Sequence, residues 1–131
     1  MAFSFDALKL RALLRITAIL LARATKRSPR LQTMLRERDL VFQIATDGGT
    51  GGHFALSNGA LRYRPGLHPA PDFAQVWKTP GDAVRVMTSP DESDLMRAFN
   101  SGLCRMEGRF TVALWFNEAM KIARSKQDGR P

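Results

Sequence analysis

The chain has 131 residues, of which 44% are hydrophobic and 24% are charged, and it carries a formal net charge of +8. Its length suits one domain, and its composition is that of an ordinary globular protein, which excludes the disordered and fibrous classes. A single cysteine, Cys104, excludes an intramolecular disulfide and a multi-cysteine zinc site, so we expect a reducing, cytoplasmic compartment.

The positive charge is concentrated near the N-terminus. Residues 1–40 hold nine basic and three acidic side chains, a net charge of +6, which leaves +2 for the other 91 residues. Such a segment suits an anionic membrane surface or a nucleic acid, and charge alone does not choose between them. The longest uncharged run of this region, 16–22, is far shorter than the roughly 20 residues that span a bilayer. We expect neither a transmembrane helix nor a secretion signal.

Residues 5–26 are predicted to form a long helix. Leucines and alanines recur at helical spacing on one side, and basic side chains are spread over the other. The simpler interpretation packs the leucine side on the domain. The alternative is an interfacial helix, with leucines in the lipid and basic residues among the headgroups. Its membrane-contacting residues would be Arg11, Leu14, Arg15, Leu21, Arg23, Lys26 and Arg27.

A short second helix, 31–38, is expected to lead into a sheet. From Val41 apolar residues alternate with a period of two, which predicts a first strand. The glycine-rich run 48–52 that follows lacks the Lys-Ser/Thr ending of a phosphate loop, so we interpret it as a connection between strands.

A β-hairpin is predicted around Asn58-Gly59. Both positions of a two-residue turn need positive φ, which this dipeptide accepts. With these two residues as the loop, strands 53–57 and 60–64 place Phe54 opposite Tyr63 on an apolar face, and polar side chains on the other.

A fourth strand, 73–78, precedes two helix starts, at Thr79-Pro80 and at Ser89-Pro90. Each start has a capping hydroxyl, a proline at the first helical position and an acidic residue close behind. The second helix is expected to turn Leu95, Met96 and Phe99 inward.

The stretch 98–116 organises the second half of the chain. Gly102 suits the left-handed position that ends a helix, a short strand 103–107 follows, and Gly108 suits a turn too tight for a side chain. We interpret 109–124 as a final helix, because its late basic residues suit the helix dipole. A strand over 110–116 is the alternative.

The sequence offers no catalytic constellation. His53 and His68 have no second ligand type at metal spacing, and Cys104 has no histidine near it in sequence. A buried, inert cysteine is the favoured interpretation. We therefore expect no enzyme activity, no metal and no cofactor.

Residues 98–108, AFNSGLCRMEG, resemble the signature of the sterol carrier protein-2 (non-specific lipid-transfer) family, in which a Phe-x-x-Gly helix end leads into a strand that closes on glycine. The resemblance covers about residues 38–124. Arg109 departs from it, since the family usually has an acid there, and so does the distinct helix opening at 79–87. Other pieces follow the family's order: Asp47-Gly48-Gly49, Asn58-Gly59, Pro71-Asp72 and Ser89-Pro90.

The resemblance implies an α+β fold, with a five-stranded mixed sheet covered by helices on one face and an apolar tunnel between them. It also implies non-catalytic binding, with or without transfer, of a fatty acyl, sterol-like or prenyl lipid. The chain would then divide into a basic amphipathic region, 1–37, a lipid-binding domain, 38–124, and a polar tail, 125–131. The tunnel would be lined by Val84, Met87, Leu95, Phe99, Met106, Phe110, Leu114 and Trp115, although each also suits an ordinary core.

Two other functions stay open. The same fold could present polyprenyl or quinone intermediates to biosynthetic enzymes. Nucleic-acid binding through the basic helix is the least favoured, because no basic stretch is interleaved with exposed aromatic residues. The expected partners are therefore a lipid and, at the N-terminal helix, an anionic membrane surface that the protein would contact peripherally.

Overall fold

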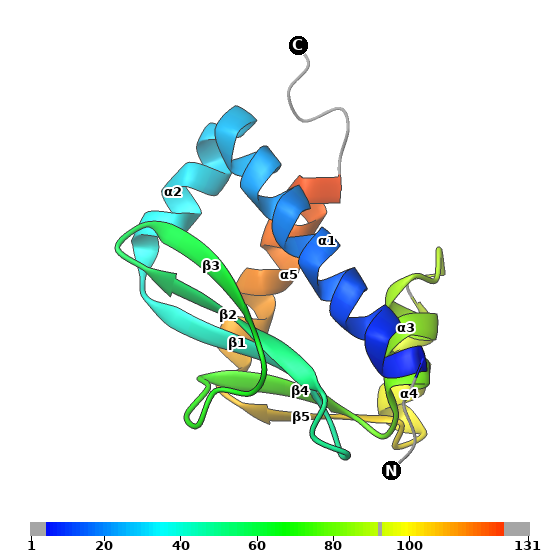
Figure 1. Ribbon diagram of the computed structural model, residues 1–131. Coiled ribbons are helices and arrows are strands. Elements are labelled where there is room, and N and C mark those ends of the chain that lie inside the picture. Colours follow the sequence, from blue (N-terminus) through cyan, green and yellow to red (C-terminus); the bar gives the residue numbers. More distant parts are fainter. Residues whose placement is uncertain (1–4, 92, 125–131) are drawn as a thin grey trace.

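The computed structural model describes residues 5–91 and 93–124, which form one mixed five-stranded sheet with helices packed against it (Figure 1). The fold class predicted from the sequence is confirmed. The helices are α1 (Phe5–Arg27), α2 (Pro29–Glu37), α3 (Pro80–Met87), α4 (Ser93–Asn100) and α5 (Phe110–Arg124). The strands are β1 (Leu40–Thr46), β2 (Gly51–Ser57), β3 (Ala60–Pro65), β4 (Phe73–Trp77) and β5 (Cys104–Gly108).

The strand order is β3-β2-β1-β4-β5, in which β1 and β4 are parallel and the other neighbours are antiparallel. The predicted hairpin register is confirmed, since Phe54 pairs with Tyr63. Its turn has φ of 54° at Asn58 and 79° at Gly59, the positive values that the dipeptide was expected to take.

The core lies between the sheet and helices α1 and α5, which cover the same face (Figure 1). Phe42 of β1 stacks on Phe116 of α5 with ring centroids 4.0 Å apart, and Phe54 of β2 lies 5.2 Å from the same ring. Leu14 and Leu21 of α1 are buried in this cluster. The predicted division between 1–37 and 38–124 stays a prediction, and the predicted tail, 125–131, lies outside the described residues.

The opposite face of the sheet carries a small buried cluster of Ala45, Ala74 and Val76, and the loop between β3 and β4. Gln43 of β1 accepts a hydrogen bond from the backbone N–H of His68 at 2.5 Å, and the His53 ring bonds the carbonyl of Gly66 at 3.1 Å. These contacts hold the loop, with the 44%-exposed Leu67, on the face away from α1.

Helix α3 tests the first of the two capping predictions. Thr79 caps α3 as expected, its hydroxyl accepting from the backbone N–H of Asp82. Helix α2 begins at Pro29, two residues before the prediction, because Ser28 caps it.

The predicted helix start at Ser89-Pro90 is wrong, since α4 begins at Ser93. The Ser89 hydroxyl accepts from the backbone N–H of Asp91, which closes a local turn, and the Asp91 carboxylate accepts from the N–H of Ser93. Asp91 therefore supplies the cap that the sequence pattern placed on Ser89.

The last helix is confirmed and the alternative strand over 110–116 is wrong. Gly102 has φ of 83° and Gly108 has φ of 104°. A Cβ on Gly108 would lie 2.3 Å from the carbonyl oxygen of Asp72, so the backbone turns there at a separation that only glycine permits. The chain then enters α5, whose Val112 and Phe116 point into the core.

Candidate functional site

The eight residues predicted to line a tunnel come from four elements. Val84 and Met87 lie on α3, Leu95 and Phe99 on α4, and Met106 on β5. The remaining three, Phe110, Leu114 and Trp115, lie on α5.

Of these eight side chains, Trp115 alone is buried, with 8% of its surface exposed. Val84, Met87, Leu95 and Met106 are partly buried and pack against the core cluster. The exposed fractions of the other three are 43% for Phe99, 59% for Phe110 and 56% for Leu114.

Leu114 and Trp115 lie apart from the other six residues, between α2 and α5. Both line a pocket of about 490 Å³ between α2 and α5, whose rim carries an ion pair between Arg30 and Glu118 at 3.3 Å. The Trp115 indole donates to the carbonyl of Met34 at 3.2 Å, which fixes the ring against α2. The other six predicted residues, which we call the open apolar set, are Val84, Met87, Leu95, Phe99, Met106 and Phe110.

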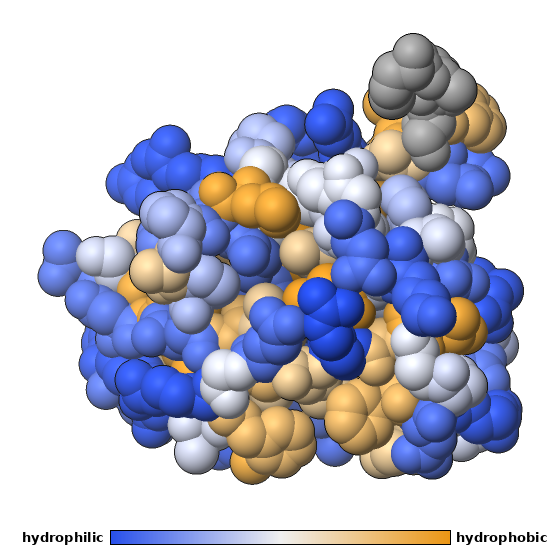
Figure 2. Space-filling model, turned by 90° about the horizontal axis from the view of Figure 1, so that it is seen from below, coloured by the Kyte–Doolittle hydropathy of each residue, from blue (hydrophilic) through white to orange (hydrophobic). Residues whose placement is uncertain are grey.

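The open apolar set lies at the β4–β5 end of the helix-covered face. Helix α3 contacts α4, and α4 contacts β5, so the elements that carry five of these residues adjoin at this end of the sheet. Phe110 follows β5 directly, as the first residue of α5. Met106 faces the helices, because its cross-strand partner Gln75 lies on the same face of β4 as Phe73 and Trp77, which are buried in the core cluster. Seen from below, hydrophobic side chains gather in the middle and along the lower margin of the molecule, with hydrophilic ones around them (Figure 2).

The buried residues beneath this set are closed to water. Trp77 is fully buried, and within the described residues its indole N–H has no hydrogen-bond partner. Its cross-strand neighbour Cys104 is also buried, and burial raises the pKa of that thiol to about 11, which Arg105 opposes only in part. At neutral pH Cys104 is therefore a thiol, not a nucleophilic thiolate.

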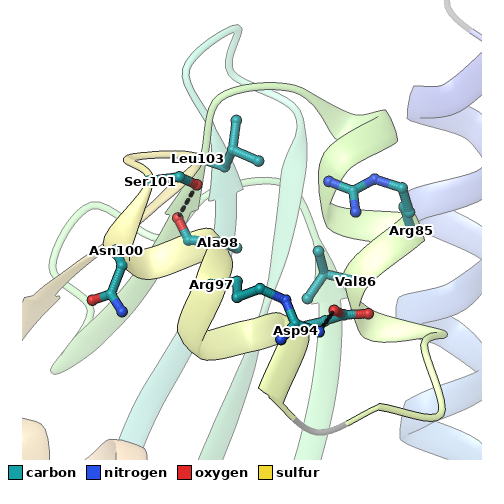
Figure 3. A pocket seen from close by; sticks show the side chains of 8 residues that line it. All are labelled: Arg85, Val86, Asp94, Arg97, Ala98, Asn100, Ser101 and Leu103. Carbon is teal, nitrogen blue, oxygen red and sulfur yellow. Dashed lines mark hydrogen bonds and ion pairs between the residues drawn. The ribbon is translucent and has the colours of Figure 1, made fainter.

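A second pocket, of about 480 Å³, lies beside the open apolar set between α3 and α4 (Figure 3). Arg97 pairs with Asp91 and Asp94 at 2.8 and 2.5 Å, and the Ser89 hydroxyl together with Arg97 holds the pKa of the Asp94 carboxyl below its usual value. The charges in this pocket are thus largely satisfied by one another. Its lining residues are Arg85, Val86, Asp94, Arg97, Ala98, Asn100, Ser101 and Leu103.

Neither pocket is lined by a residue of the sheet, so a tunnel between sheet and helices stays a prediction. The sequence pattern also turned Met96 and Phe99 inward, and this is wrong, because 60% and 43% of their surfaces are exposed. Ala98 is instead the residue through which α4 is buried. The observed start of α4, Ser93, lies three residues after Pro90, the predicted first helical position.

The predicted membrane-contacting residues of α1 fall into an exposed group and a buried group. The five basic ones on α1 are exposed, whereas Leu14 and Leu21 are 0% and 1% exposed and face the core. Among the described residues, no helix is long and apolar enough to cross a membrane. No three or more His, Cys, Asp or Glu side chains within 5–91 and 93–124 lie close enough together to hold a metal ion.

Solved structures resemble this architecture over nearly the whole chain. The structure described as "UbiJ-SCP2 Ubiquinone synthesis protein" matches 89% of this chain and 99% of its own, with a TM-score of 0.62 and 18% identity. Sterol carrier protein 2 from Yarrowia lipolytica, in its apo form, matches 96% of this chain and 100% of its own, with a TM-score of 0.60 and 13% identity. The chain has the sterol carrier protein 2 fold.

This fold assignment rests on structure. The sterol carrier protein domain 2 of Helicoverpa armigera matches 89% of this chain and 88% of its own, with a TM-score of 0.55 and 16% identity. No family model matches the sequence, and no curated protein does. The resemblance drawn from residues 98–108 therefore agrees with the sterol carrier fold found by structural similarity.

Proposed function

We propose that this chain binds a hydrophobic lipid without catalysing its conversion, and that the open apolar set holds the ligand. The observation that carries the proposal is the partial exposure of these six side chains beside an otherwise closed core. Lipid binding by proteins of the sterol carrier fold supports it.

The energetics favour a long apolar ligand. Each methylene that leaves water for an apolar surface gains about 0.8 kcal/mol, so an acyl or prenyl chain needs few polar contacts to bind. Met87 and Met106 have flexible, polarisable side chains that adapt to ligands of different shape. We therefore expect the binding to tolerate fatty acyl, sterol-like and prenyl lipids.

A titration with a fluorescent fatty acid tests this proposal. We expect saturable binding with a micromolar or lower Kd, lost on Phe99→Arg, which puts a charge in the open apolar set at an exposed position. Leu114→Arg is the matched control and should keep binding, because Leu114 is also exposed but lies at the α2–α5 pocket. Absence of binding across fatty acyl, sterol and prenyl probes, in folded wild type, would contradict the proposal.

A second candidate function is an accessory role in which the chain presents polyprenyl or quinone intermediates to biosynthetic enzymes. The similarity to the structure described as a ubiquinone synthesis protein favours it. Competition of a prenylated quinone against the bound fatty acid separates the two. Tight displacement by the quinone and weak displacement by other lipids supports the accessory role, and equal displacement supports a general carrier.

We further propose an anionic membrane surface as the place where the protein meets its lipid. The supporting observation is that all six basic side chains of α1 are exposed: Lys9, Arg11, Arg15, Arg23, Lys26 and Arg27. The location is then cytoplasmic and peripheral to the membrane, as expected from the sequence. Nucleic acid is the less favoured partner for the same charges.

A further inference from the structure

Helix α1 carries apolar side chains on two opposite sides. The inner side, with Leu10, Leu14 and Leu21, is 0–1% exposed and packs on the sheet and α5. This one side is sufficient to pack the helix on the domain. Yet the outer side also carries large apolar residues, which we call the outer stripe: Phe5, Leu8, Ile16 and Ile19, exposed to 64%, 48%, 53% and 48%.

The outer stripe lies on one side of the helix, as two pairs, Phe5 with Leu8 and Ile16 with Ile19, that are about two turns apart. At 3.6 residues per turn, its four residues lie within about 80° of the helix circumference. Clustered apolar side chains in water mark a surface that binds another apolar phase or molecule. The outer stripe therefore indicates that α1 has a partner outside the described domain.

The charges around the stripe select that partner. All six basic side chains of α1 are exposed, against one acid, Asp6. On the β3 side, the Arg15 guanidinium lies 5.9 Å from the Tyr63 ring centre, so it flanks the stripe. A second copy would bring two such basic helices together, which like-charge repulsion opposes, and a nucleic acid would gain nothing from the leucine and isoleucines. An anionic bilayer satisfies both features.

We propose that α1 docks on an anionic phospholipid bilayer through the outer stripe while its inner leucines stay packed on the sheet. The helix therefore acts as a two-sided layer between the domain and the membrane and does not detach. This arrangement differs from the interfacial helix predicted from the sequence, in which Leu14 and Leu21 enter the lipid. It rests on the membrane partner proposed above and is independent of which lipid the open apolar set holds.

The structure offers a way to lock α1 in place. A Cβ on Gly81 of α3 would lie 3.9 Å from the Cβ of Asp6, within the roughly 3.5–4.5 Å range of disulfides, so Asp6→Cys with Gly81→Cys should cross-link the helix start. The native Cys104 is buried with a raised pKa and should not compete. The other end is already held, because α1 runs into α2 through Ser28, whose N–H bonds the carbonyl of Ala24.

The experiment is co-sedimentation with phosphatidylcholine vesicles that contain or lack phosphatidylglycerol. We expect the oxidised lock to bind anionic vesicles as well as its reduced form does. Leu8→Ser, Ile16→Ser and Ile19→Ser together should weaken binding by about tenfold or more, with folding intact, because all three side chains are exposed. Arg15→Gln should weaken it about fivefold, an effect that added salt should abolish.

Two controls test whether vesicle binding is specific to the outer stripe and whether it is independent of fatty-acid binding. Leu67→Ser removes an equally exposed leucine on the other face of the sheet and should leave vesicle binding unchanged. Phe99→Arg should abolish fatty-acid binding but keep vesicle binding, so a failure of the lipid-cargo proposal is distinguishable from a failure here.

Three outcomes would overturn the inference. Loss of vesicle binding in the oxidised lock, restored on reduction, would show that the helix must detach and insert its inner leucines. Unchanged binding by the triple serine variant would show that the outer stripe is not in the lipid. Salt-dependent binding to DNA or RNA without vesicle binding would assign the basic face to nucleic acid.

Discussion

The two ends of the helix-covered face differ in how completely they bury their apolar side chains. At the β1–β2 end, Phe42 and Phe54 are 2% and 0% exposed and pack on Phe116. At the β4–β5 end, the side chains above Cys104 and Trp77 are half-exposed or exposed. One face of one sheet therefore supports both a closed core and an open apolar surface.

We infer from this difference that the closed end stabilises the fold and that the open end binds the ligand. Stacked aromatic rings fill space densely and stabilise the fold, whereas the open end uses methionines and singly exposed rings, which can rearrange around a guest. Substitutions at the closed end should therefore cost stability, and substitutions at the open end should cost ligand binding.

The largest expected loss of stability is at the closed end. Phe42→Ala removes a ring stacked 4.0 Å from Phe116 and 5.5 Å from Phe73, and should lower the free energy of unfolding by about 3–5 kcal/mol in urea denaturation. A loss below about 1 kcal/mol would mean that this end is as loosely packed as the other.

Alkaline pH tests whether the layer beneath the open end is dry. Burial raises the pKa of Cys104 to about 11, so in the unfolded chain the thiol ionises first. Its contribution to stability is complete below pH ~8.5 and should be lost as the pH rises to about 11, by at most roughly 2–3 kcal/mol.

The measurement for that prediction is the difference in unfolding free energy between wild type and Cys104→Ala across pH 8–11. Other groups titrate in this range, and the difference cancels them. A difference that does not change with pH would show that the thiol is in contact with water.

The link between α2 and α5 should contribute a smaller amount. Trp115→Phe keeps an aromatic ring but removes the N–H that bonds the Met34 carbonyl at 3.2 Å, so we expect a loss of about 1–2 kcal/mol in thermal or urea unfolding. Fatty-acid affinity should stay within about twofold, because this ring lies outside the open apolar set. A larger loss of affinity would place the ligand at the α2–α5 pocket.

The smallest effect on stability is expected for Phe99→Ala. Its ring is 43% exposed, so unfolding should change by about 0.5 kcal/mol or less while fatty-acid affinity falls at least about fivefold. Met96→Ala, also on α4 and 60% exposed, is a useful comparison because Met96 was not among the predicted lining residues. Equal effects of the two changes would mean that the whole exposed side of α4 contacts lipid.

Much of the fold could be predicted because its signals are local. Asn58-Gly59 fixed the hairpin turn and with it the pairing of Phe54 with Tyr63. Thr79 capped α3 with a hydrogen bond that spans three residues. The start of α4 was missed because Ser89 and Asp91 compete for the same backbone donors, and a pattern cannot rank two caps so close together.

The parts of the site that depend on packing between distant elements could not be predicted. Trp115 was predicted to line the tunnel, and nothing in the sequence indicated that its indole N–H donates to the Met34 carbonyl of α2. For α1 the spacing did place Leu14 on the leucine side that packs on the domain, but it could not choose between that packing and insertion of the same side into lipid; the structure buries Leu14 and leaves Ile16 exposed. Half-exposure of Met106 and Leu95 likewise becomes visible only once α3, α4 and β5 are brought together.

The most direct test of the central claim is photo-cross-linking with a fatty acid that carries a diazirine in its chain, followed by peptide mapping. We predict adducts on α3, α4 and β5, at or next to Met87, Phe99 and Met106, that unlabelled fatty acid competes away. Adducts confined to the α2–α5 pocket around Leu114, or adducts that excess fatty acid does not reduce, would contradict the claim that the open apolar set holds the lipid.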